Sequence, residues 1–158
     1  MASELPFDSY PGQGRKLLGA VKGSNCRAGY GAKFIEITRE RQCAYCSRDL
    51  LAQYELWLTM VLDHVIPVSV CENAGIPTNL TLDMSNMVLA CAACNGFHNR
   101  YALPEAFGPL TPESFYDVRD KIFRDRRRQI EERHRIELQI YEKQLAKIQG
   151  GIQSISAL

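Results

Sequence analysis

The sequence predicts an α+β fold with an irregular N-terminal arm, a small core of two short strands and a short helix, and one long C-terminal helix. Two apolar runs, residues 56–66 and 87–89, are dense in strand-forming side chains. Two CxxC pairs enclose these runs, and residues 113–149 contain neither glycine nor proline. At 158 residues the chain has the length of one ordinary domain.

The boundaries of these parts follow changes in composition. Residues 1–30 are rich in glycine and basic side chains and show little hydrophobic periodicity, so an irregular arm is expected. Residues 31–110 form the predicted core. Residues 32–41, which introduce it, fit a short helix or a strand about equally, and we favour the helix. Residues 111–149 form the long helix, and residues 150–158, which begin with two glycines, are expected to be a flexible tail.

Four of the six cysteines have the spacing of a zinc site. One CxxC pair is Cys43 and Cys46, and the other is Cys91 and Cys94. Each pair can occupy two corners of a tetrahedral zinc ion, at about 2.3 Å per bond. Because four sulfurs leave no open position on the ion, this zinc is predicted to be structural. Cys26 and Cys71 are then ordinary thiols.

The chain starts with MASELPFDSY, without the basic start and apolar run of a signal peptide. We therefore expect a cytoplasmic location, where paired cysteines bind metal rather than form disulfides. The longest apolar stretch, residues 56–62, is far shorter than the roughly 20 residues of a membrane span, so no membrane association is expected. A content of 46% hydrophobic and 23% charged residues is typical of a globular protein.

The first apolar run predicts a strand over residues 56–66 that ends before Pro67. Its last residues include Asp63 and His64, a carboxylate next to an imidazole. A strand end places such side chains near solvent and within reach of a substrate. These two residues are therefore candidates for chemistry.

The stretch between the two apolar runs reads as a loop over residues 71–85, because it contains Gly75, Pro77 and Asn79. The second strand, over residues 87–89, leads into the second cysteine pair. A helix over residues 92–101 follows it.

The long helix begins at Thr111-Pro112, a capping threonine followed by proline at the first helical position. It is expected to be about 57 Å long at 1.5 Å per residue. A first apolar stripe, Phe115, Val118 and Ile122, is predicted to pack on the core. A second stripe is predicted to pack against a second copy of the chain or a partner protein, with its histidine in a packing role. This stripe consists of Ile130, His134, Leu138, Tyr141, Leu145 and Ile148.

The order of the segments CAYC, LDHVIP and SNMVLACAACNGFHN resembles that of the HNH endonuclease family. The resemblance covers residues 43–99 and implies a ββα-metal core, in which a zinc-knuckled strand pair and a helix surround one divalent cation. In the family pattern His64 is the first histidine, Asn86 the central asparagine, and Asn95 the final histidine, where asparagine is a common variant. His98 stands where family members often have a lysine, which is a departure from the pattern.

These residue types fit phosphodiester hydrolysis, which needs a base to activate water and a cation to neutralise the leaving oxygen. His64 can be that base, because histidine titrates near neutral pH. The oxygens of Asp63 and Asn95 are hard ligands that suit Mg²⁺ or Mn²⁺. The resemblance implies that Asn86 holds the strand and loop geometry by hydrogen bonds. For His98, one helical turn after Asn95, a catalytic or ligand role and a merely polar surface role both stay open.

The resulting hypothesis is a cytoplasmic HNH endonuclease that cuts DNA with one Mg²⁺ or Mn²⁺ ion beside a structural zinc, in restriction, phage defence or a mobile element. Two basic clusters suit a phosphate backbone. They are Arg15, Lys16, Lys22, Arg27 and Lys33 near the N-terminus, and Arg124, Arg126, Arg127 and Arg128 in the long helix. Two alternatives stay open: a non-catalytic zinc-ribbon module that binds nucleic acid, and a nuclease subunit that is active only within a larger complex.

Overall fold

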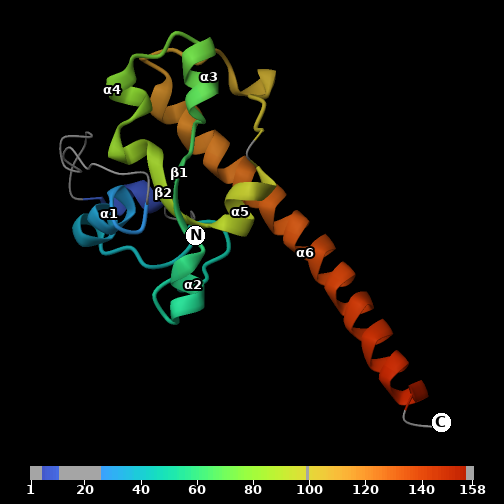
Figure 1. The fold of residues 1–158 in the computed structure, drawn as a ribbon. Helices are drawn as coiled ribbons and strands as arrows, with labels where there is room; N and C mark the ends of the chain where they lie inside the picture. The colour runs from blue at the N-terminus through green and yellow to red at the C-terminus, as the bar shows by residue number, and fades with distance from the viewer. Residues whose placement is uncertain (1–4, 11–25, 99, 156–158) are drawn as a thin grey trace.

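The centre of the fold is a two-stranded antiparallel sheet of β1 (Met60–His64) and β2 (Met87–Cys91). The strands pair along their whole lengths, with His64 opposite Met87. Helix α5 (Ala92–Phe97) begins directly after β2, so two strands and a helix follow one another as predicted (Figure 1). The predicted α+β core is confirmed.

The computed structural model describes residues 5–10, 26–98 and 100–155, the last five of these by their backbone alone. Of the predicted N-terminal arm, residues 5–10 lie on the core, where the 3-10 turn η1 (Pro6–Ser9) buries Phe7. The basic residues Arg15, Lys16 and Lys22 of the arm lie outside the described residues, as does Asn99.

Helix α1 (Tyr30–Thr38) confirms the short helix predicted before the first cysteine pair. Its side chain Phe34 is fully buried in the core. A Cβ atom at Gly31 would lie 2.6 Å from the sulfur of Cys26 and 3.2 Å from the side chain of Met60. Glycine at this position therefore allows the helix to approach β1 closely.

The predicted strand over residues 56–66 is wrong in its first part. Helix α2 (Tyr54–Leu58) occupies this stretch, and only Met60–His64 is extended. The reason is the length of the partner strand: β2 ends at Cys91, which pairs with Met60, so earlier residues have no strand to pair with. Their backbone groups bond locally instead, with the N–H of Trp57 donating to the carbonyl of Gln53 at 3.0 Å.

The predicted loop over residues 71–85 is also wrong, because most of it is helical. It contains the second half of α3 (Val68–Asn73), all of α4 (Thr78–Thr81) and the start of the 3-10 turn η3 (Met84–Asn86). Helices α3 and α4 each begin directly after a proline, whose fixed φ suits the start of a helix. Gly75 and Pro77, which suggested a loop, thus lie between the end of α3 and the start of α4.

Helix α5 is shorter than predicted, because it ends at Phe97 rather than at residue 101. The hydroxyl of Tyr101 donates to Asp125 of the long helix at 2.9 Å, which draws the chain away from the α5 axis. The 3-10 turn η4 (Glu105–Phe107) then leads to the long helix.

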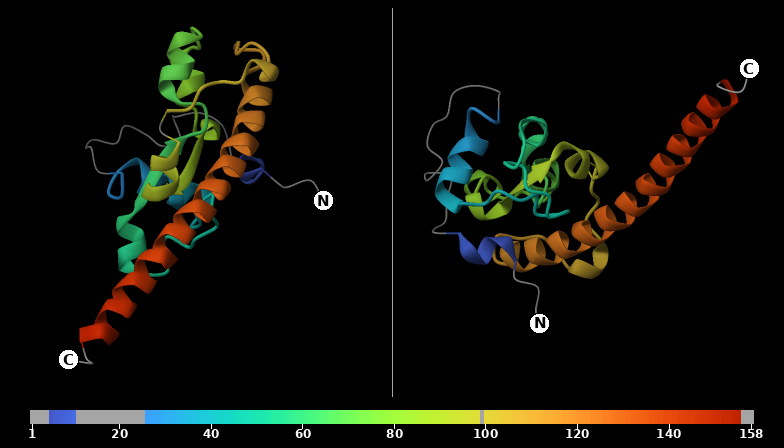
Figure 2. Two further views of the ribbon diagram at one scale, coloured as in Figure 1. Left: turned by 90° about the vertical axis from the view of Figure 1, so that its right-hand side faces the viewer. Right: turned by 90° about the horizontal axis from the view of Figure 1, so that it is seen from below.

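The predicted long helix is confirmed as α6, Phe115–Ile155, but both of its predicted ends are wrong. It begins at Phe115, after a turn over residues 112–114, rather than at Pro112, and it passes through Gly150 instead of ending at residue 149. Its first half lies along the core and its second half projects from it (Figure 2). The first apolar stripe packs on the core as predicted, but Ile130, which was placed in the second stripe, is fully buried there as well. From Leu138 to Ile148 the large apolar side chains of the helix are exposed. Among the described residues, no helix combines the length and apolar character that a bilayer span requires.

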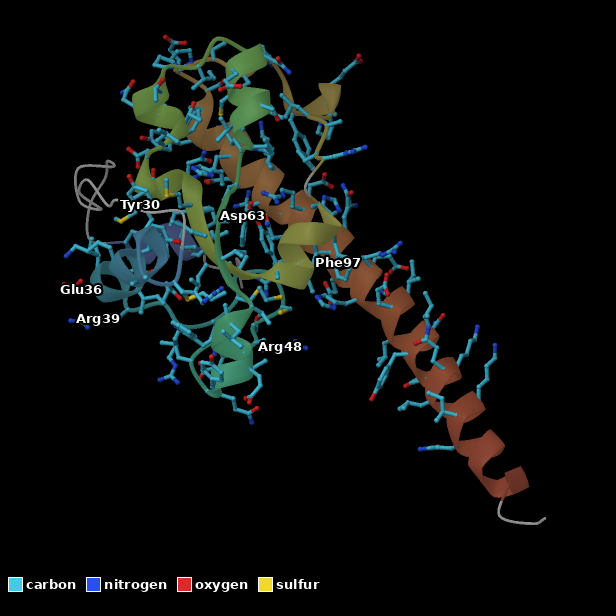
Figure 3. All side chains as sticks on the ribbon, in the orientation of Figure 1. Tyr30, Glu36, Arg39, Arg48, Asp63 and Phe97 are labelled. Carbon is cyan, nitrogen blue, oxygen red and sulfur yellow. The ribbon has the colours of Figure 1, made fainter. Side chains whose placement is uncertain are left out.

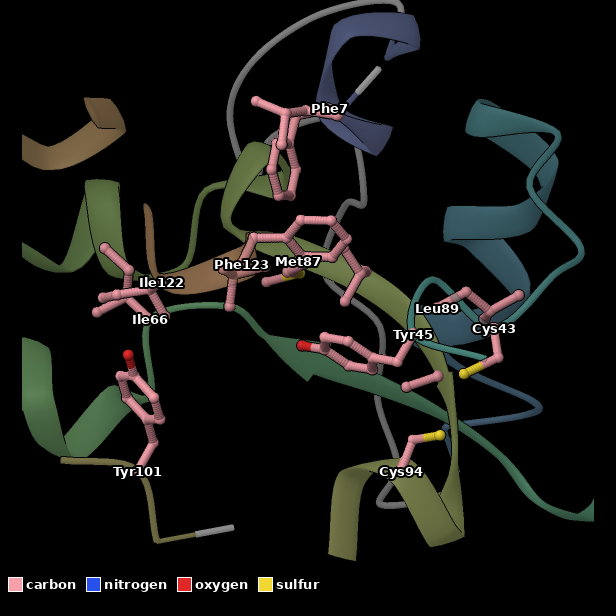
Figure 4. Packing of buried hydrophobic residues seen from close by; sticks show 14 of the residues in the cluster. Phe7, Cys43, Tyr45, Ile66, Met87, Leu89, Cys94, Tyr101, Ile122 and Phe123 are labelled. Atoms are coloured by element: carbon pink, nitrogen blue, oxygen red, sulfur yellow. The ribbon is translucent and has the colours of Figure 1, made fainter. Parts of the chain in front are cut away.

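A row of aromatic rings connects the N-terminal turn, the long helix and the first cysteine pair (Figure 4). Phe7 meets Phe123 edge to face, with ring centroids 5.4 Å apart. Phe123 in turn stacks on Tyr45 at 5.7 Å. Because a two-stranded sheet alone buries little apolar surface, these rings supply much of the core that holds the site in place.

Candidate functional site

The four predicted zinc ligands come together at one end of the sheet. The sulfur atoms of Cys43, Cys46, Cys91 and Cys94 all lie within 4.8 Å of one another. Those of Cys46 and Cys91 are 4.0 Å apart, close to the roughly 3.8 Å edge of a tetrahedron with 2.3 Å zinc–sulfur bonds. The sulfurs of Cys43 and Cys94 point toward one another (Figure 4). This cluster can hold a zinc ion.

The first cysteine pair lies in a tight turn that is attached to β2. The N–H of Cys43 donates to the carbonyl of Arg48 at 2.9 Å, and the N–H of Ser47 donates to the carbonyl of Cys43 at 2.8 Å. Ser47 has a left-handed φ of 59°, which closes the turn. The N–H of Ala44 donates to the carbonyl of Leu89 at 2.8 Å, so the turn is fixed to the middle of β2.

The sulfurs of the cluster contact backbone N–H groups and one another. The N–H of Cys91 points to the sulfur of Cys43 at 3.4 Å, and that of Cys94 to the sulfur of Cys91 at 3.5 Å. Hydrogen bonding from Cys43 is the largest cause that lowers the pKa of Cys46, and it also lowers the pKa of Cys91 to about 6. Hydrogen bonding from Cys46 raises the pKa of Cys43, and hydrogen bonding from Cys43 raises the pKa of Cys94. Since zinc binds the thiolate form, this donor set suits the metal.

His134 of the long helix also reaches the cysteine cluster. Its Nε2 lies 3.0 Å from the sulfur of Cys94, and its ring meets Phe97 edge to face at 5.0 Å. The sequence predicted only a packing role for this histidine. The contact with Cys94 corrects that prediction, because an imidazole N–H beside a thiolate can donate a hydrogen bond to it.

A hollow of about 260 Å³ lies where β1 ends, and it contains most of the residues predicted for chemistry. The polar residues that line the hollow come from three elements: the end of β1, helix α5 with the residue that follows it, and the long helix. Its polar lining consists of Asp63, His64, Asn95, His98 and Arg126. The arrangement places an imidazole, a carboxylate and a neutral amide around one space, as a hydrolytic metal site requires.

Asp63 is held by two donors from distant parts of the chain. Its Oδ2 accepts the hydroxyl of Tyr45 at 2.6 Å and an N–H of Arg126 at 2.9 Å. The carboxylate is 9% exposed and lies on β1 beside the long helix (Figure 3). Both of these contacts fall on one oxygen. The role of Asp63 as a metal ligand stays a prediction.

His98 borders the hollow and is partly buried. Burial is the largest cause that lowers its pKa below the usual 6.5, and the charge of Arg126 lowers it further. Asp125 and Asp63 act in the opposite direction. A neutral imidazole is therefore favoured at neutral pH, which is the form that can accept a proton or bind a metal.

Asn86 lies away from the hollow and is fully buried. Its Oδ1 accepts the N–H of Ile66 at 2.9 Å, and its Nδ2 donates to the carbonyls of Ile66 and Thr81 at 3.1 and 2.9 Å. These bonds fix the chain just after His64 against the turn before β2. The side chain can thus position the end of β1 without touching a metal.

The fold and the site define a class of protein: an antiparallel strand pair and a helix, tied by a four-cysteine cluster, with an Asp-His pair at a strand end. Residues 43–100 match the model of the family described as HNH endonuclease, so the resemblance to this family is confirmed for that segment. No significant match was found among the curated proteins or among the solved structures.

Sequence reasoning missed three side chains at the site. Arg126 was seen only as part of a basic cluster, Tyr45 had no assigned role in chemistry, and His134 was placed in an apolar stripe. All three act through contacts between distant parts of the chain. The one available signal was the position of an arginine between the apolar residues Ile122 and Ile130, on the face of the helix that packs on the core.

Replacing Asn86 with alanine is expected to lower the free energy of unfolding by about 3 kcal/mol, because the buried backbone groups of Ile66 and Thr81 lose their partners. Urea unfolding followed by circular dichroism measures the change. Asn79→Ala is the matched control, since Asn79 is exposed on α4, and it should change stability by less than about 0.5 kcal/mol. Equal stability of the two variants would contradict the role assigned to Asn86.

Proposed function

We propose that this protein is a metal-dependent endonuclease that hydrolyses phosphodiester bonds of DNA. The observation that carries the proposal is the convergence of Asp63, His64 and Asn95 on one hollow, within a segment that matches the HNH endonuclease family. Proteins of this family act on DNA, which supports the substrate.

In the proposed reaction His64 accepts a proton from the attacking water, and the carboxylate of Asp63 and the amide oxygen of Asn95 hold a Mg²⁺ or Mn²⁺ ion. The ion supplies positive charge at the leaving oxygen. Two protein ligands suit such an ion, because Mg²⁺ normally keeps several waters that a phosphate can replace. His98 borders the same space and is proposed as a neutral contact to phosphate or metal. Asn86 is proposed to act by holding the end of β1.

The four-cysteine cluster is proposed to hold zinc in a structural role. The fit rests on the mutual distances of the sulfurs and on backbone N–H groups directed at them. Four sulfur ligands leave no site for substrate or water, so the chemistry belongs to the hollow.

A basic surface on the long helix supports the DNA substrate. Arg124 and Arg128 are exposed, and Arg127 is partly exposed, on the part of the helix that lies along the core. Arg128 also borders a second hollow that shares His98 with the first. Such side chains would contact phosphates without reading sequence.

The first test is cleavage of supercoiled plasmid by the purified chain with Mg²⁺, with Mn²⁺ or with EDTA. We expect nicking or linearisation that requires the metal and falls at least about 100-fold in His64→Ala, because general base catalysis typically contributes that much. The variant should keep its circular dichroism spectrum and zinc content. Tight DNA binding without cleavage by the wild type would favour the non-catalytic zinc module instead, and cleavage that appears only with added cellular proteins would favour a subunit of a larger complex.

The zinc assignment is tested by the metal content of two cysteine variants. The wild type is expected to contain one zinc ion per chain, and Cys43→Ala is expected to lose both the zinc and the folded state, because the metal contributes directly to folding. Cys71→Ala is the matched control: Cys71 is equally buried but lies in α3, outside the cluster. Full zinc content in Cys43→Ala would rule out the four-cysteine site.

The projecting half of α6 is proposed to bind a second copy of the chain. Leu138, Tyr141, Leu145 and Ile148 are exposed and follow one another at intervals of three and four residues, the spacing of a two-stranded coiled coil. Two copies would bring two nuclease sites to one duplex.

Sedimentation measures this association. The full chain is expected to be a dimer at about 50 µM, the micromolar range in which a short coiled coil associates. A chain that ends at Glu137 is expected to be a monomer, because the truncation keeps the buried Ile130 and the contact of His134. A full chain that stays monomeric would leave a partner protein as the explanation of the exposed face.

A further inference from the structure

We propose that Arg126 is a positioning residue of the nuclease site, which orients the carboxylate of Asp63 and the backbone of His64. The inference rests on the proposed function. It extends the site beyond the segment that matches the family, since Arg126 lies in the long helix and the match ends at residue 100.

The guanidinium of Arg126 makes three contacts at the end of β1. Its Nη2 lies 2.9 Å from Oδ2 of Asp63, and its Nη1 donates to the carbonyls of His64 and Val65 at 2.9 and 3.0 Å. One planar group therefore holds the side chain of the proposed metal ligand and the backbone of the proposed base at the same time. The fixed fork of a guanidinium can do this, whereas the single ammonium of a lysine cannot.

The surroundings of Arg126 hold it in one orientation. The side chain is 1% exposed, and its charge lies 5.3 Å from the centre of the Tyr45 ring. Ile122 and Ile130, one turn of the helix before and after it, are both fully buried. Arg126 thus has little freedom to leave the end of β1.

Burying the charge of this arginine lowers the stability of the fold, which indicates a role beyond packing. Its Nε has no hydrogen-bond partner among the described residues, and a buried N–H without a partner destabilises a fold. An apolar side chain would fill the same volume without a charge. The arginine is explained by what it holds, which is Asp63 and the carbonyl groups beside it.

Tyr45 acts on the same oxygen of Asp63. Its hydroxyl donates to Oδ2 at 2.6 Å, next to the contact from Arg126. The two donors on Oδ2 fix the rotation of the carboxylate. Neither of them contacts Oδ1, which is the oxygen left to bind a cation. Asp63 borders the hollow with His64 and Asn95, so this orientation places the ligand where the reaction is proposed to occur.

The test measures kcat and KM for plasmid cleavage in Arg126→Gln, Arg126→Lys and Tyr45→Phe at saturating Mg²⁺. We expect kcat to fall about 100-fold in Arg126→Gln, the loss that a shift of about 1 Å in a reacting group produces, while KM for DNA changes less than about threefold. Arg126→Lys and Tyr45→Phe should each lose about tenfold, because a lysine keeps a positive charge beside Asp63 and Tyr45→Phe keeps the contact from Arg126. Arg135→Gln is the matched control, since Arg135 is an exposed member of an ion pair on the same helix, and its kcat should not change.

Zinc content and circular dichroism separate positioning from folding in every variant. If Arg126→Gln does not fold, Tyr45→Phe still tests the inference, because it keeps the ring that stacks on Phe123 and removes only the hydroxyl. A kcat within twofold of the wild type in the folded variants would overturn the inference and leave the proposed function in place. A loss that appears only in KM would also overturn it, because a direct DNA contact explains that result. Absence of cleavage by the wild type would overturn the proposed function, and the inference with it.

Discussion

The burial of one carboxylate, that of Asp63, determines how the parts of this protein fit together. A buried charge is destabilising unless it is paired and hydrogen-bonded, and Asp63 has too few partners on its own strand. Its two donors come from the turn of the first cysteine pair and from the long helix. Both segments must therefore lie against the end of β1 for the carboxylate to be buried there, and this is the place where the proposed chemistry occurs.

The small sheet explains why the long helix is part of the core. Two strands of five residues each present too little apolar surface to fold alone, and a zinc site adds a local constraint rather than a large core. Phe115, Ile122 and Phe123 supply the missing apolar surface from α6, and Phe7 adds to it from the N-terminal turn. The segment that resembles the HNH family is thus completed by residues on both sides of it.

The sequence predicted the parts of the site that depend on local spacing. The two cysteine pairs, the Asp-His pair and the helix after β2 follow from short motifs. In the structure the four cysteines form one cluster, and Asp63, His64 and Asn95 line one hollow. Contacts across the chain could not be predicted, because nothing in the basic cluster of the helix distinguishes Arg126 from Arg124 except its position on the apolar face. The strand predicted for the stretch before β1 is wrong for a similar reason. The apolar residues of this stretch suit a strand, but a strand also needs a partner, and whether one lies there depends on where β2 ends.

The long helix connects the two chemically distinct ends of the sheet. Arg126 contacts Asp63, and His134, eight residues or about 12 Å further along the same face, contacts Cys94. Because a helix between two such contacts is stiff, α6 sets the spacing between the cysteine cluster and the end of β1. The turn of the first cysteine pair also reaches this carboxylate directly, because Tyr45 lies between Cys43 and Cys46 and donates to Oδ2 of Asp63. The proposed zinc cluster and the proposed catalytic hollow therefore share two elements, the turn of the first cysteine pair and the long helix, although they lie at opposite ends of the strands.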